Sequence, residues 1–235
     1  MHQIGLFPYI PFFTDIIKVE QDVGILAIEI LPVSMRITSP PLSRHLFCSE
    51  VRRILSQQHI TNFVLVSHSY GTALSTHILH DPLLRPRLAS LLLVDPIPFL
   101  LHLPTVAFNF IYRKPTTANE WQLWYFASRD MGIAHALARH FFWTENILWK
   151  EELDGLPSAV VLAGQDSVLD AKEVWKYLTG TSPPTELTEE WSENTMTVRW
   201  YQRLDHSQVF LTKERREPIV KLLQRFVWIA TPVLD

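Results

Sequence analysis

The sequence contains one cysteine, Cys48, among 235 residues. An internal disulfide needs two cysteines, so none can form, and a metal site built from several cysteines is excluded. A lone free cysteine behaves as a small apolar side chain. This sparing use of cysteine favours a reducing, intracellular compartment.

Long runs of one charge are also absent. The 21 basic and 24 acidic side chains give a formal net charge of -3 and are scattered along the chain. Nucleic-acid binding requires a clustered basic surface. We therefore expect no nucleic-acid partner.

The sequence indicates neither a signal peptide nor a membrane span. Residues 1–13 are apolar, but no basic residue precedes the apolar part and Pro8 and Pro11 interrupt it. The apolar run 97–112 is too short and too broken by proline to cross a bilayer. Contact of this run with a membrane surface, as a lid, is an alternative that we disfavour.

Hydrophobic side chains make up 47% of the chain and charged ones 19%, enough for one α/β domain with a sizeable core. Apolar runs of strand length alternate with helical patterns, which predicts a mostly parallel sheet with right-handed crossovers. The predicted strands are 24–31, 63–66, 88–94, 158–163 and 197–201. Residues 96–153, rich in proline and aromatic side chains, interrupt this alternation as two or three helices. The core domain is thus predicted at 1–95 and 154–235.

Helix boundaries have their own signals. Ser43 and Asp170 are predicted to cap the helices that follow them. Pro218 is predicted to lie in the first turn of the last helix. The polar stretch 179–195 is predicted to be a solvated loop.

The sequence Ser-His-Ser-Tyr-Gly at 67–71 stands between a predicted strand and a predicted helix. It resembles the nucleophile elbow of the α/β-hydrolase family, Gly-x-Ser-x-Gly, in which the serine occupies a strained turn. The resemblance implies that Ser69 is a nucleophile. The tight turn needs small residues two before and two after the serine; Gly71 fits, whereas Ser67 departs from the usual glycine.

The same resemblance implies a base and an acid. Asp166 follows the strand 158–163 in a Gly-x-Asp sequence, and His206 follows the last strand, giving the family's order Ser, Asp, His. Asp95, at the end of the strand 88–94, is the alternative acid because some family members carry the acid there. A metal site at His77 and His80 is disfavoured, since no further ligand is visible.

Near the N-terminus, His2-Gln3-Ile4-Gly5 resembles the family's His-Gly-x-Gly oxyanion loop, with Gln3 in place of a glycine. The resemblance implies that the backbone N–H groups of Ile4 and Tyr70 form the oxyanion hole. The alternative is an apolar arm packed on the core. In the family this loop follows a central strand, so the first three strands are expected to be missing, either because the chain is truncated or because the sheet closed by pairing 24–31 with 63–66.

Taken together, the resemblance implies an α/β-hydrolase fold: a mostly parallel sheet flanked by helices, with 96–153 as a helical cap. It implies hydrolysis of an ester, or a related acyl bond, of an apolar small molecule or lipid-like substrate, with no cofactor and no metal. Thioesterase, peptidase and acyltransferase chemistry use the same groups. The alternative from another class is a truncated, non-catalytic pseudo-hydrolase that binds a ligand or a partner. The sequence leaves the oligomeric state open.

Overall fold

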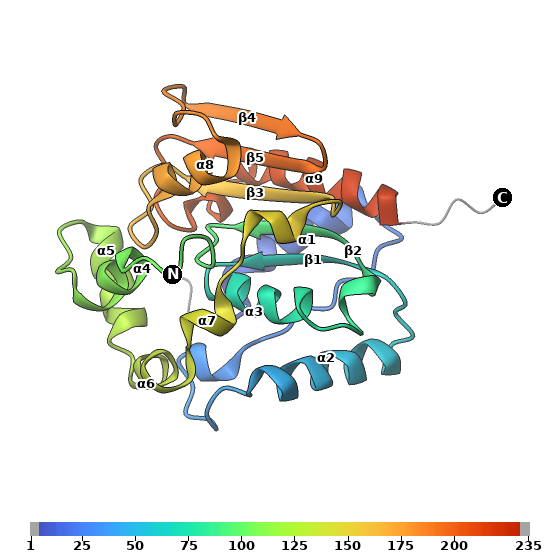
Figure 1. Cartoon of the computed structure of the whole chain (residues 1–235), viewed down its shortest axis with the longest axis horizontal. Coiled ribbons are helices and arrows are strands. Elements are labelled where there is room, and N and C mark those ends of the chain that lie inside the picture. The colour runs from blue at the N-terminus through green and yellow to red at the C-terminus, as the bar shows by residue number, and fades with distance from the viewer. Residues whose placement is uncertain (1–4, 231–235) are drawn as a thin grey trace.

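The computed structural model describes residues 5–230, and its centre is a five-stranded sheet with helices on both faces (Figure 1). The strand order is β1-β2-β3-β5-β4. The strands are β1 Phe63–His68, β2 Leu88–Val94, β3 Ser158–Ala163, β4 Thr188–Glu193 and β5 Met196–Tyr201. All pairs are parallel except β4 with β5. The predicted mostly parallel α/β sheet is confirmed.

The central strands are apolar throughout because both faces of the sheet are covered. On one face, Leu91 and Leu93 of β2 pack with Trp175 and Trp200. On the other face, Leu92 belongs to the core cluster that includes residues of the first and last long helices. These two layers hold β2 and β3 rigidly, so the loops at their carboxyl ends start from fixed positions.

Five long helices flank the sheet: α1 Ile10–Val19, α2 Arg44–Gln57, α3 Tyr70–Leu79, α8 Ala171–Thr179 and α9 Lys213–Ala230. The predicted caps are confirmed, because Ser43 accepts the N–H of Leu46 and Asp170 accepts the N–H of Glu173. None of the helices within 5–230 is long and apolar enough to cross a bilayer.

The predicted start of α9 near Pro218 is wrong, because the helix begins at Lys213 and Pro218 lies inside it. Proline removes one helix hydrogen bond. The turn before it is held from outside, since Arg216 pairs with Asp15 of α1 at 2.8 Å and donates to the carbonyl of Phe210. These tertiary contacts therefore allow the helix to begin five residues before Pro218, at Lys213.

Residues 24–31 form no strand, so both that predicted strand and its pairing with 63–66 are wrong. Several apolar side chains of this run are exposed, and Leu26 is 44% exposed. Within residues 5–230, β1 has β2 on one side and no strand on the other. An apolar run predicts contact with apolar surface but not strand pairing, and this run lines a groove beside β1.

The polar stretch 179–195 contains β4, where we predicted only a loop. β4 is an exposed strand paired on one side, antiparallel to β5. Only Trp191 in it is half-buried. A strand exposed on both faces and at the edge lacks the apolar signal that marks buried strands.

Residues 96–153 are helical and lie at the end of the sheet where the parallel strands terminate, drawn green to yellow in Figure 1. The segment has three short α-helices, one of ten residues (α6) and two π-helical turns, in place of the two or three helices predicted. They are α4 Thr105–Ala107, α5 Ala118–Leu123, α6 Met131–His140, α7 Trp143–Asn146, and the turns Phe108–Tyr112 and Trp124–Ser128. Their role as a cap stays a prediction.

Candidate active site

Three side chains singled out in the sequence meet at the carboxyl ends of the strands. Ser69 follows β1, Asp166 follows β3 and His206 follows β5. The hydroxyl of Ser69 lies 2.8 Å from Nε2 of His206, and Nδ1 of His206 lies 2.7 Å from Oδ2 of Asp166. Parallel strands bring these positions together because their carboxyl ends share one edge.

The turn that carries Ser69 is strained. Its φ is 50° and its ψ is -121°, a region that residues other than glycine rarely occupy. The turn is held because the N–H of Ser69 donates to the carbonyl of Val94 at 3.0 Å. The departure at Ser67 is accommodated, since its hydroxyl accepts a 2.8 Å hydrogen bond from Ser75 of α3.

Asp166 has a fully buried carboxylate. Oδ1 accepts the backbone N–H groups of Val168 and Leu169, while Oδ2 faces His206. Burial raises the pKa of this carboxyl, and the imidazole and the N–H donors oppose that rise. The two N–H bonds fix the carboxylate, so Oδ2 is aimed at Nδ1.

His206 is buried, and burial by itself would lower the pKa of its imidazole. The nearby carboxylates of Asp166 and Asp95 outweigh burial and raise the pKa to about 9. With Nδ1 donating to Asp166, the neutral ring presents an unprotonated Nε2 to the Ser69 hydroxyl. This is the tautomer that accepts a proton from a serine.

Asp95, the alternative acid, does not bond to the His206 ring. Oδ1 accepts the N–H of Ala163 at 3.2 Å, and Oδ2 accepts the N–H of Ser207 at 2.5 Å. The geometry thus favours Asp166 over Asp95 as the partner of Nδ1.

Asp95, Asp166 and His206 have polar atoms within 4.8 Å of one another, the spacing of a possible metal site. Those atoms are already engaged, however, in the hydrogen bonds between Asp166 and His206 and from backbone N–H groups to the carboxylates. A metal ligand set would have to break them. His80 of the disfavoured metal pair bonds to Glu152 instead.

Of the two backbone N–H groups predicted to form an oxyanion hole, the structure describes only that of Tyr70. Tyr70 is the first residue of α3, so its N–H belongs to the helix end that has no acceptor within the helix. Ile4, the other predicted donor, lies outside the described residues, as do His2 and Gln3.

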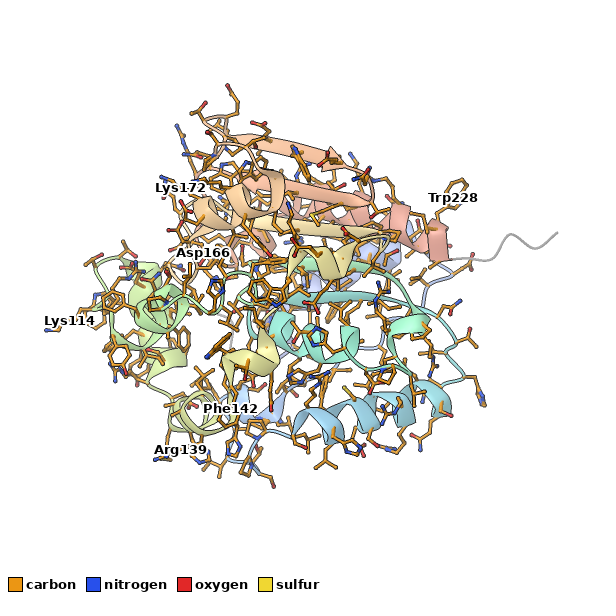
Figure 2. The ribbon with its side chains drawn as sticks, viewed as in Figure 1. Lys114, Arg139, Phe142, Asp166, Lys172 and Trp228 are labelled. Atoms are coloured by element: carbon orange, nitrogen blue, oxygen red, sulfur yellow. The ribbon has the colours of Figure 1, made fainter. Side chains whose placement is uncertain are left out.

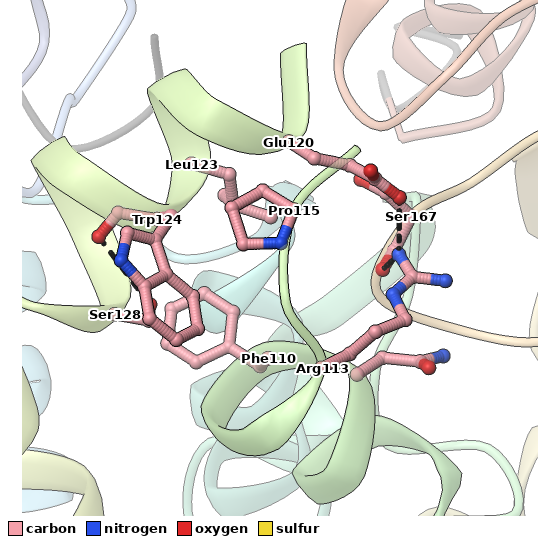
Figure 3. A pocket seen from close by; sticks show the side chains of 9 residues that line it. Phe110, Arg113, Pro115, Glu120, Leu123, Trp124, Ser128 and Ser167 are labelled. Atoms are coloured by element: carbon pink, nitrogen blue, oxygen red, sulfur yellow. Dashed lines mark hydrogen bonds and ion pairs between the residues drawn. The ribbon is translucent and has the colours of Figure 1, made fainter. Parts of the chain in front are cut away.

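Residues of the helical segment 96–153 hold the loops that carry Asp166 and His206. Arg113 donates to the carbonyl of Ser167 at 2.6 Å and pairs with Glu120 (Figure 3). Asn119 of α5 donates to Asp205, the residue before His206. Figure 2 shows Asp166 where this segment meets the sheet. The segment therefore holds the loops after β3 and β5 through hydrogen bonds to Ser167 and Asp205.

An open groove of about 940 Å³ runs beside β1, on the side that no strand within residues 5–230 covers, and Ser69 and Tyr70 are among its lining residues. Most of its lining is apolar. Its walls include Phe12, Phe13 and Ile16 of α1 and Phe47, Val51 and Leu55 of α2. Such a surface suits an apolar ligand with few polar groups.

Sequence reasoning missed two polar residues, Tyr9 and His68, beside Ser69. The hydroxyl of Tyr9 lies 2.7 Å from Nδ1 of His68, and Nε2 of His68 lies 3.5 Å from Oδ2 of Asp95. His68 is the residue before Ser69, but nothing in its local sequence indicates a contact with Tyr9, 59 residues away.

Known proteins resemble this chain in structure but not in sequence. The sequence matches no family model. No curated protein matches it either. A 2-hydroxy-6-oxo-6-phenylhexa-2,4-dienoate hydrolase from Rhodococcus sp. strain RHA1 superposes with a TM-score of 0.57 at 12% identity, covering 95% of this chain and 85% of that one.

Two further solved structures are similar to this chain over most of its length. A putative alpha/beta hydrolase family protein from Desulfitobacterium hafniense gives a TM-score of 0.57 at 13% identity, covering 92% of this chain and 89% of that one. A structure from a study of carboxylesterases of the thaumarchaeon Nitrososphaera gargenis gives 0.53 at 13% identity, covering 96% and 86%. The chain has the α/β-hydrolase fold, as the sequence resemblance implied.

Proposed function

We propose that this chain is a serine hydrolase that cleaves an ester bond of an apolar, lipid-like small molecule through an acyl-enzyme. The observation that carries the proposal is the continuous hydrogen-bonded series from Ser69 through His206 to Asp166. It lies in a fold shared with structures described as hydrolases and carboxylesterases.

In this mechanism His206 removes the proton of Ser69 as the hydroxyl oxygen attacks the ester carbonyl. Asp166 holds the ring in the correct tautomer and stabilises the imidazolium that forms. The N–H of Tyr70, and that of Ile4 in our proposal, stabilise the oxyanion of the tetrahedral intermediate. The imidazolium then protonates the leaving alcohol, and a water activated by the same imidazole releases the acid.

The apolar groove supports an apolar acyl substrate. Ser69 is among the residues that line it, so a substrate bound there would lie beside the proposed nucleophile. The described residues that line it are mostly apolar, although Glu29, Gln58 and Asn62 add polar groups. An ester of an aliphatic acid therefore matches this surface better than a polar ester does.

A fluorophosphonate probe, which reacts with activated serines, tests the proposal. The wild-type protein should be labelled, whereas Ser69→Ala and His206→Ala variants should not. Ser192→Ala is the matched control, because Ser192 lies in the exposed edge strand β4 and its hydroxyl bonds to Thr197, away from the site. It should be labelled like the wild type.

A series of p-nitrophenyl esters from acetyl to long acyl chains then tests the substrate class, and kcat/KM should rise with chain length. Failure of a folded wild-type protein to react with the probe would reject the hydrolase. The non-catalytic pseudo-hydrolase would then be the better description.

A further inference from the structure

A second polar series lies buried beside the first. It consists of Tyr9, His68 and Asp95, which we call the Asp95 series. It runs from the hydroxyl of Tyr9 to Nδ1 of His68 at 2.7 Å, and from Nε2 of His68 to Oδ2 of Asp95 at 3.5 Å. The side chains of His68 and Asp95 are 6% and 1% exposed. Polar groups this deeply buried cost stability unless they are paired, so the series calls for a structural or functional reason.

The Asp95 series ends on the loop of the proposed base. Oδ2 of Asp95 accepts the N–H of Ser207, the residue directly after His206, at 2.5 Å. Ser207 has a φ of 61°, a left-handed conformation that a residue other than glycine adopts only at a cost. The carboxylate thus holds the backbone bend that aims the imidazole of His206 at Ser69.

Asp95 itself is held by several elements. Its own φ is 45°, and its N–H donates to the carbonyl of Val161 on β3. Oδ1 accepts the N–H of Ala163, at the end of the same strand. His68 approaches from β1. The carboxylate of Asp95 is therefore fixed relative to β1, β2 and β3. Because it is fixed, its bond to the Ser207 N–H also fixes the backbone at Ser207.

Proton positions in the series are consistent with an anionic Asp95. Burial lowers the pKa of His68 to about 4, so its ring is neutral. Burial also raises the pKa of the Tyr9 hydroxyl, which therefore stays protonated and donates a hydrogen bond to Nδ1 of His68. The ring proton of His68 then lies on Nε2, facing Asp95. Burial by itself would raise the pKa of Asp95, but His68, His206 and the Ser207 N–H together lower it.

We propose that Asp95, supported by His68 and Tyr9, is a positioning residue for His206: it holds the Ser207 backbone and adds a second negative charge beside the imidazole. The proposal concerns the same site and rests on the proposed function for its role in catalysis. Among the described residues, the charged and titratable groups that act on His206 include Asp166 from the loop after β3, Asp95 from the end of β2, His68 from the end of β1, and Asp205 on its own loop.

The first test reads the His206 ring directly and does not require activity. The imidazole of His206 is titrated by NMR in the full-length wild-type chain and in an Asp95→Asn variant, which removes the charge and keeps the shape. A polar atom of Asp95 lies within 4.8 Å of one of His206. A carboxylate that close favours the charged form of the imidazole, so the proton affinity of His206 should fall about tenfold in the variant.

Asp81→Asn is the matched control. Asp81 is also a buried aspartate, 9% exposed, which accepts two backbone N–H groups and pairs with a basic side chain, Arg52. It lies outside the site. This variant should lose thermal stability without changing the titration of His206. If Asp95→Asn likewise loses only stability, Asp95 is merely structural and the proposal is wrong.

Tyr9→Phe provides a second test that does not depend on the folding of Asp95→Asn. It keeps the ring against Phe210 and removes only the hydroxyl that orients His68. The rate of reaction with the fluorophosphonate should fall several-fold, and the melting temperature should fall by only a few degrees, because the variant removes one buried hydrogen bond. An unchanged rate would overturn the proposal. A wild-type protein that does not react rejects the proposed function, while the NMR titration still decides the role of Asp95.

Discussion

The hydroxyl oxygen of Ser69 lies 2.8 Å from Nε2 of His206, although 137 residues separate the two in the chain. The contact depends on three parallel pairings, β1 with β2, β2 with β3 and β3 with β5. Because each pairing fixes one strand end against the next, the site is a property of the whole sheet. A shift of any of these strands therefore changes the distance between Ser69 and His206.

Replacement of Asp166 by asparagine should lower kcat by about 10⁴-fold, because the amide no longer holds His206 in the tautomer with an unprotonated Nε2. The measurement is ester hydrolysis at saturating substrate. Asp170→Asn is the control, since Asp170 caps α8 by accepting the N–H of Glu173 and takes no part in the series. A small loss in Asp166→Asn, with a large loss in Asp95→Asn, would instead identify Asp95 as the acid.

Activity should rise with pH through the alkaline range. His206 acts as a base only when neutral, and its pKa is raised to about 9. Below that value the protonated fraction grows, so kcat/KM should fall about tenfold for each pH unit well below the pKa. A pH profile of ester hydrolysis tests this, and a half-maximum near the ordinary histidine value of 6.5 would contradict it.

The elbow should tolerate alanine at position 71. A Cβ added to Gly71 would meet only the Cβ of Ser67, at 3.7 Å, which is an ordinary contact. We expect Gly71→Ala to fold and to react with the fluorophosphonate. By contrast, Ser67→Gly restores the family's usual glycine but removes the partner of Ser75, and should cost about 1 kcal/mol in the free energy of unfolding. Loss of reactivity in Gly71→Ala would show that the turn is tighter than its contacts indicate.

Gly164, directly after β3, should not tolerate alanine. Its Cβ would lie 2.7 Å from Cζ2 of Trp200 and 2.9 Å from the carbonyl oxygen of Gln202. Trp200 is fully buried, so the strand end must move, at a cost of about 1 to 3 kcal/mol. Gly24→Ala, where no atom lies within 4 Å of the added Cβ, should change stability by no more than about 0.5 kcal/mol. Chemical denaturation of both variants decides the point, and equal stabilities would contradict it.

The sequence predicted the buried strands well because burial on both faces leaves an unbroken apolar run, as in β2 and β3. It failed at residues 24–31 because such a run also occurs where a segment lines an open groove. It failed at β4 because an exposed edge strand carries polar residues. Local signals identify a strand only where local burial and strand pairing coincide.

Ser69, Asp166 and His206 were predicted from the family resemblance, through the elbow sequence and the positions just after strands, and the structure brings their side chains together. Their order along the chain was as informative as their surroundings. The Asp95 series could not be found in this way. Its Tyr9 and His68 belong to a helix-start region and a strand 59 residues apart, and only the fold brings them together. A contact at long separation that belongs to no known motif, such as Tyr9 with His68, carries no signal in a single sequence.

The two edges of the sheet differ in chemistry. β4 carries three glutamates, Glu189, Glu190 and Glu193, whose charges oppose the approach of another strand. β1 presents Phe63, Val64, Leu65 and Val66, and no strand within 5–230 covers its outer side. The charges of β4 therefore oppose further strand pairing at that edge, whereas the apolar edge at β1, next to Ser69, carries no such charge.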